Sequence, residues 1–137
     1  MIIIKCINIP GEVEEGVNLD IVGVNTRAAW VIDGATPLTA VKPRKAVELT
    51  REFAERLGSI LSGHLLDEVY SLKEIVEFAH RKLVEEYGSK GSLRGLPLHA
   101  YPSASLAVIR YDSKAERIEY AVIGDCVVIE KQGIISL

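Results

Sequence analysis

Features that identify several protein classes are scarce in this chain of 137 residues. It has only two cysteines, Cys6 and Cys126, and neither has a histidine or cysteine at the spacing of a zinc site. Because unpaired cysteines are usually buried, we expect both to be buried thiols in strands. Lys and Arg number 16 against 19 Asp and Glu, so the net charge of -3 gives no basic surface for nucleic acid. No nucleic-acid partner is therefore expected.

Long apolar runs are also missing. The N-terminal run from Met1 to Ile4 is interrupted by Lys5, which leaves it too short for a signal-peptide core or a membrane span. Hydrophobic residues make up 48% and charged residues 26%, as in globular proteins with a hydrophobic core. We expect one cytoplasmic domain over residues 1–137, with no membrane association.

The N-terminal part of the sequence predicts β-strands. Met1 to Ile9 predicts a first strand, and a second extended region runs from Asp20 to Ile32. The middle of that region, Gly23 to Arg27, has the composition of a hairpin turn, so we expect two strands joined at Asn25. Asp33 ends the second of them.

Two helices are predicted next, because apolar residues recur at steps of three and four. The first runs from about Arg44 to Leu61. The second begins at Ser71, which has a glutamate, Glu74, three positions later as in a capping box. It runs to Tyr87, where glycine follows. The pair is expected to form an antiparallel helical hairpin.

The C-terminal part returns to strands, predicted at Ala104–Tyr111, Arg117–Ile123, Cys126–Glu130 and from Gly133 to the end. The run from Ala104 to Ile109 is apolar at nearly every position, which predicts a strand covered on both faces. Strands, two helices and further strands together indicate an α+β fold, with helices on a mostly antiparallel sheet. One sheet with two helices covers only one face, so a second layer is expected that is not fully encoded here.

One acidic side chain stands out at the exit of an apolar strand. Asp33 follows Ala28 to Ile32, and the next residue, Gly34, allows a sharp turn and a close approach of the backbone to whatever the carboxylate holds. Mg2+ or Mn2+ would suit this position, since both prefer carboxylate, carbonyl and water oxygens. An ordinary Asp-Gly turn at a strand end is the alternative.

Three separated elements together resemble a known family. The stretch Ala29 to Thr36 is followed by the helical pair, then by Pro102 to Ile109, and then by Ile118 to Ile129 with its Gly124-Asp125 turn. This order resembles the metal-dependent protein serine/threonine phosphatases (the PPM, or type 2C, family), and its divergent prokaryotic members in particular. The resemblance covers essentially the whole chain and the N-terminal part of that family's domain.

The resemblance implies a PPM phosphatase-like sandwich and a site for two Mg2+ or Mn2+ ions. Asp33 matches the carboxylate that bridges the ions, Gly34 matches the residue that lends its carbonyl, and Asp125 matches the acidic residue of the Gly-Asp turn. Asn18 to Asp20 resembles an upstream Asn-x-Asp element, which makes Asp20 the second acidic residue of the site. In such a site a metal-activated water attacks the phosphoester of a phosphorylated protein or other substrate, and no Ser or Cys nucleophile is needed.

The chain also departs from the family. Its members carry further aspartates in the last third of the domain, and this sequence ends at Leu137 before those elements. Three explanations stay open: a fragment of a longer phosphatase, a short homologue that cannot catalyse, or a half-domain completed by a second copy or another partner. The alternative function is therefore an inactive phosphatase-like regulatory or binding module.

Other readings of single residues also stay open. Asp20 and Asp125 are common types of turn residue in their own right. His64, His80 and His99 have no second histidine or cysteine at i+3 or i+4 and are expected to be structural. An N-terminal nucleophile hydrolase would need Thr, Ser or Cys at the mature N-terminus, and Met1 argues against it.

Overall fold

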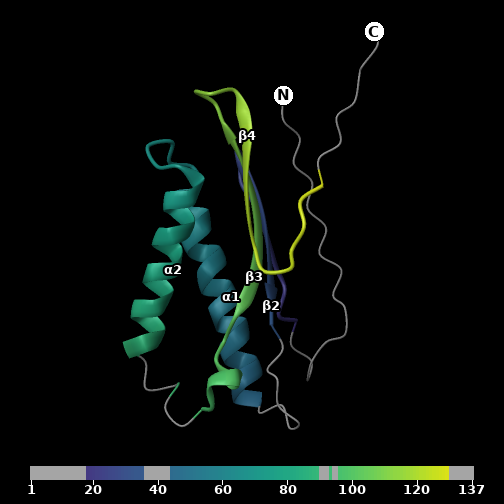
Figure 1. The fold of residues 1–137 in the computed structure, drawn as a ribbon, viewed down its shortest axis with the longest axis vertical. Helices are drawn as coiled ribbons and strands as arrows, with labels where there is room; N and C mark the ends of the chain where they lie inside the picture. The colour runs from purple at the N-terminus through teal and green to yellow at the C-terminus, as the bar shows by residue number, and fades with distance from the viewer. Residues whose placement is uncertain (1–17, 36–43, 90–92, 94–95, 130–137) are drawn as a thin grey trace.

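The computed structural model describes residues 18–35, 44–89, 93 and 96–129 (Figure 1). Four strands form one antiparallel sheet in the order β1-β2-β3-β4. The elements are β1 (Ile21–Val24), β2 (Ala28–Gly34), α1 (Arg44–His64), α2 (Leu72–Ser89), the 3-10 helix η2 (Leu98–Ala100), β3 (Ala104–Asp112) and β4 (Arg117–Ile123). Both α-helices lie on the same side of the sheet (Figure 1). This part of the chain is therefore α+β, as predicted.

The predicted hairpin at Asn25 is confirmed. Its side-chain Oδ1 accepts the backbone N–H groups of Arg27 at 2.9 Å and of Ala28 at 2.8 Å, which fixes the turn. The two strands then pair antiparallel from Ile21 opposite Ile32 to Val24 opposite Ala29. The register that follows from this turn decides which residues share a face of the sheet.

Both predicted helices are present, with small differences at their ends. Helix α1 continues to His64, three residues past the predicted end, and α2 ends at Ser89. The capping box at the start of α2 is confirmed: Ser71 Oγ accepts the N–H of Glu74 at 3.3 Å. In return the Glu74 carboxylate accepts the Ser71 N–H at 2.8 Å and its hydroxyl at 2.7 Å.

The hydrophobic core lies between the helical pair and one face of the sheet. Its largest fully buried apolar side chains come from α1, α2, the segment between them, β2 and β3: Ile32, Val47, Leu61, Leu65, Ile75 and Val108. Trp30 on β2 is also buried, and its indole lies across Gly23 on β1, where an added Cβ would be 2.1 Å from the ring. The absence of a side chain at Gly23 therefore makes room for the indole.

The other face of the sheet carries the predicted site. Along β2, residues alternate between buried and less buried positions, and Val31 and Asp33 are exposed. On β3 one face is buried and the other is half-buried, so the prediction that Ala104 to Ile109 is covered on both faces is not met by the residues that the structure describes. The physical reason is that the two helices pack on one face only.

One strand prediction is wrong. Cys126 to Ile129 form no strand, and the side chains of Val127 and Ile129 are 74% and 88% exposed. A run with strand propensity becomes a strand only when a neighbour pairs with it, and none of the described strands does so. The predicted strands at Met1–Ile9 and from Gly133 onward lie outside the described residues.

Neither α1 nor α2, nor any other helix within the described ranges, has the combination of length and apolarity that crossing a bilayer requires.

Candidate functional site

The three predicted acidic ligands lie at the same end of the sheet. Asp33 lies at the end of β2 and pairs in register with Ser105 on β3. Asp20 directly precedes β1, so continuing the pairing of Ile21 with Ile32 places Asp20 beside Asp33. Asp125 follows β4 and bonds to Ser105. Two carboxylates from the ends of the first hairpin and one from the turn after β4 therefore lie in one region.

The electrostatics of Asp33 show that the carboxylates interact. Burial raises the pKa of Asp33 above its usual value of 3.8, and Asp20 raises it further through its negative charge and a side-chain hydrogen bond. The charge of Asp125 acts in the same direction. These contributions all disfavour the ionised carboxylate, because like charges repel where water is partly excluded. A bound proton or cation would relieve this repulsion.

Asp125 is held in place by Ser105. The Ser105 hydroxyl donates to Asp125 Oδ1 at 2.6 Å and accepts the Asp125 N–H at 3.4 Å. The hydroxyl bond lowers the pKa of Asp125, so this carboxylate stays ionised in neutral solution. Gly124 makes the approach possible: its φ is +81°, and an added Cβ would lie 2.3 Å from Ser105 Oγ.

The segment that carries Asp20 is fixed from two sides. Asn18 Oδ1 accepts the Asp20 N–H at 2.9 Å, and the Leu19 side chain between them is buried. From α1, the guanidinium of Arg51 donates to the backbone carbonyls of Asn18 and Asp20, while its Nε bonds to Glu55 at 2.7 Å. Arg51 is a cation near the site that sequence reasoning missed, since only the packing of α1 against this segment brings it there.

The predicted role of Gly34 needs correction. It does not turn the backbone sharply: it is the last residue of β2, pairs with Ala104 and does not have a positive φ. Its lack of a side chain instead allows the backbone of Leu19 to approach β2 closely, because an added Cβ would lie 2.7 Å from the Leu19 carbonyl oxygen. Gly34 therefore keeps the Asp20 segment against the end of β2, where Asp33 lies.

Cys126 also lies in this region, which its expected role as a buried strand residue did not suggest. It is half-buried rather than fully buried. Burial raises the pKa of its thiol, and the negative charges of Asp33, Asp125 and Asp20 raise it further. In the absence of a cation the thiol is therefore protonated at neutral pH, a form that does not attack as a nucleophile.

The donors match Mg2+ or Mn2+ in type but are incomplete in number. Carboxylate oxygens are the ligands that these hard cations prefer, and the repulsion around Asp33 is what a cation would offset. Within the described residues, however, no group of three or more His, Cys, Asp or Glu side chains is placed to hold a metal ion. A complete site thus requires further ligands or an adjustment of these side chains.

Comparisons with known proteins give no assignment: no protein-family model, no curated protein and no solved structure matches this chain.

Proposed function

We propose that this chain belongs to a Mg2+- or Mn2+-dependent phosphoester hydrolase similar to the PPM protein serine/threonine phosphatases. The observation that supports the proposal is the meeting of Asp20, Asp33 and Asp125, the three residues that the resemblance selects, at one end of the sheet. The proposed substrate is a phosphorylated protein or another phosphoester.

The residues have distinct parts in this proposal. Asp33 is the central ligand, Asp20 and Asp125 add carboxylate oxygens, and Gly34 supplies its backbone carbonyl. Ser105 orients Asp125 through the 2.6 Å bond to its carboxylate. These residues would hold the cations, whose chemistry would be to lower the pKa of water toward neutrality. The further ligands come from a longer chain, a second copy or another partner.

A second candidate function also has an observation behind it. Because the described residues contain no three-ligand group, the chain is alternatively an inactive phosphatase-like module that binds partners without hydrolysis. Such a module would neither bind Mn2+ specifically nor hydrolyse phosphoesters.

The test is hydrolysis of p-nitrophenyl phosphate with and without Mn2+, comparing the wild type with Asp33→Ala. Asp112→Asn is the matched control, because Asp112 lies at the other end of β3 and accepts turn N–H groups there. The proposal predicts Mn2+-dependent hydrolysis that Asp33→Ala abolishes and Asp112→Asn retains.

Two other outcomes separate the alternatives. Mn2+ binding without hydrolysis, lost in Asp33→Ala, would support the metal site but leave catalysis to a chain with additional ligands. Absence of both binding and hydrolysis would overturn the hydrolase proposal for this chain and favour the inactive module. Oligomeric mass measured by light scattering on the same samples would show whether activity requires a second copy.

A further inference from the structure

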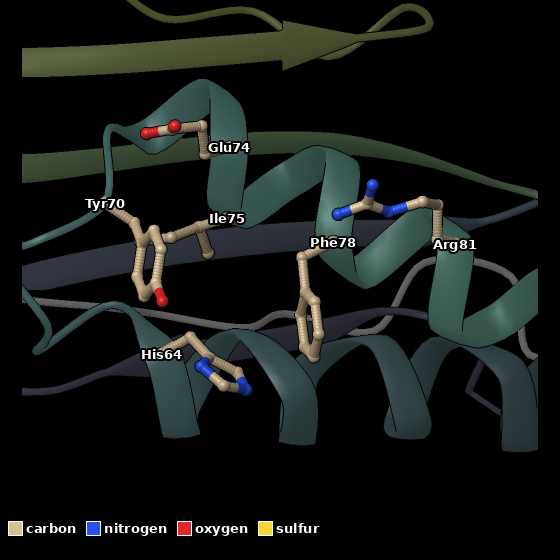
Figure 2. Close-up of a pocket in the computed structure, with 6 residues that line it drawn as sticks. All are labelled: His64, Tyr70, Glu74, Ile75, Phe78 and Arg81. Carbon is tan, nitrogen blue, oxygen red and sulfur yellow. The ribbon is translucent and has the colours of Figure 1, made fainter.

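A hollow that shares no residue with the candidate metal site lies between the end of α1 and the first turns of α2 (Figure 2). Its volume is about 300 Å³, and it is lined by His64, Tyr70, Glu74, Ile75, Phe78 and Arg81. An adjoining hollow of about 240 Å³ shares His64 and Phe78 with it and extends along the helices to Arg56 and Lys82. None of these residues was singled out for binding by sequence reasoning.

The walls of the first hollow are flat and largely apolar. Figure 2 shows the rings of Tyr70 and Phe78 and the imidazole of His64 pointing into the same space. The His64 and Phe78 rings meet edge to face, with centroids 4.7 Å apart, and Ile75 is buried behind them. Tyr70 is 51% exposed although it is a large aromatic residue. These surfaces suit a flat, apolar body.

A positively charged side chain borders this apolar space. The guanidinium of Arg81 extends along α2 toward Phe78 (Figure 2), and it has no hydrogen bond or ion pair with any residue that the structure describes. By contrast, the two cations of the adjoining hollow are paired: Arg56 Nε bonds to Glu86 at 2.8 Å, and Lys82 Nζ lies 3.3 Å from Glu85. Arg81 is thus the lining cation left to attract an anion.

The one acidic lining residue does not cancel this charge. The Glu74 carboxylate bonds to the N–H and hydroxyl of Ser71 at the start of α2. Figure 2 shows it turned toward that end of the helix, whereas the Arg81 side chain starts two turns further along. Glu74 therefore serves the helix N-terminus, where a negative charge is favourable.

The fold holds the hollow in shape before any ligand binds. From β3, the buried guanidinium of Arg110 donates to the backbone carbonyls of Asp67 and Tyr70, each at 3.0 Å. The capping box at Ser71 fixes the next residue. The loop that carries Tyr70 is consequently held at both ends, and a ligand would not have to order it on binding.

We infer that this hollow binds a small aromatic acid, a flat ring that bears a carboxylate or phosphate group. The ring lies among Tyr70, Phe78 and Ile75, and the anionic group bonds to the Arg81 guanidinium, with His64 and the Tyr70 hydroxyl as further polar partners. The inference is independent of the proposed metal site, since the two share no residue.

The test is an NMR titration of the 15N-labelled chain with benzoate and phenyl phosphate, with neutral benzamide and inorganic phosphate as matched probes. We expect both aromatic acids to shift the amide signals of residues 64–81, and to bind more tightly than either matched probe. Arg81→Gln should weaken benzoate binding about tenfold or more, as expected for loss of a charge-assisted hydrogen bond. Arg44→Gln, an exposed arginine on α1 outside the hollow, should change it less than about twofold.

Several results would overturn the inference. Equal affinities for benzamide and benzoate would show that the negative charge does not contribute to binding. Equal affinities for inorganic phosphate and phenyl phosphate would show that the apolar walls do not contribute. Unchanged benzoate affinity in Arg81→Gln would also refute the inference. So would the absence of amide signal shifts at an aromatic acid concentration of about 20 mM, which would detect even weak binding. Because Arg81 is exposed, the variant should fold, and its NMR spectrum checks this directly.

Discussion

Replacement of Asp33 by asparagine removes the charge of this carboxylate while keeping its shape. In the wild type without cations, burial and the charges of Asp20 and Asp125 disfavour ionised Asp33. The side chain is partly exposed, so solvent screens this repulsion to the scale of a surface ion pair, about 0.5–1 kcal/mol. We expect Asp33→Asn to be more stable than the wild type by that amount at pH 7 in EDTA.

The sign of this effect depends on pH. Since the pKa of Asp33 is raised in the folded state, folding favours its protonated form. The wild type therefore has its full stability from this group below the unfolded value of 3.8, and loses it as the pH rises through the folded pKa. Asparagine does not titrate, so the advantage of the variant should vanish near pH 3 and reach its maximum at neutral pH.

Thermal unfolding followed by circular dichroism measures the difference. For a chain of this size, 0.5–1 kcal/mol corresponds to a rise in Tm of about 2–4 °C. Mn2+ at about 100 times its Kd should add about 2.7 kcal/mol to the wild type but little to Asp33→Asn. Asp125→Asn is the control that should show no gain in EDTA, because its carboxylate is already favoured by Ser105.

A lower stability of Asp33→Asn than of the wild type at pH 7 in EDTA would contradict the charge repulsion around Asp33. An equal rise in the Tm of both proteins with Mn2+ would show that Asp33 does not bind the cation.

Three other predictions concern the framework around the site. Arg110→Leu should lower the free energy of unfolding by about 3 kcal/mol in urea titrations, because it strands a partly buried carboxylate and two carbonyls; a loss below 1 kcal/mol would contradict this. Gly23→Ala should cost about 2–3 kcal/mol, since its Cβ would overlap the Trp30 indole, and a shift in tryptophan fluorescence should accompany it. Ser105→Ala should raise the pKa of Asp125 toward its usual value, measured by carboxyl 13C NMR; an unchanged pKa would exclude the hydroxyl as its cause.

Local patterns were sufficient for most of the described elements. The helical periodicity located α1 and α2 to within a few residues, and the capping box at Ser71 was visible because its two partners are only three residues apart. The hairpin at Asn25 was likewise predictable from turn composition. The strand predicted at Cys126 failed because strand formation depends on a paired neighbour, which a local pattern does not encode.

The candidate site, too, was only partly predictable from the sequence. The residue types and their motifs selected Asp20, Asp33 and Asp125, but only the strand register and the turn at Gly124 brought them together. No sequence pattern predicted the contact of Arg51 with the Asn18 carbonyl or the hollow beside Arg81, since both depend on how α1 packs against other elements.

The helices, the first hairpin and the α+β class could be predicted from the amino-acid sequence, because they follow from interactions between residues close along the chain. Three features became visible only in the folded chain: the repulsion among the carboxylates, the close approach of Leu19 to Gly34, and the position of Arg81 beside an apolar hollow, without a partner among the described residues. Charge repulsion, steric exclusion and cavity shape depend on distances between side chains, and folding sets those distances.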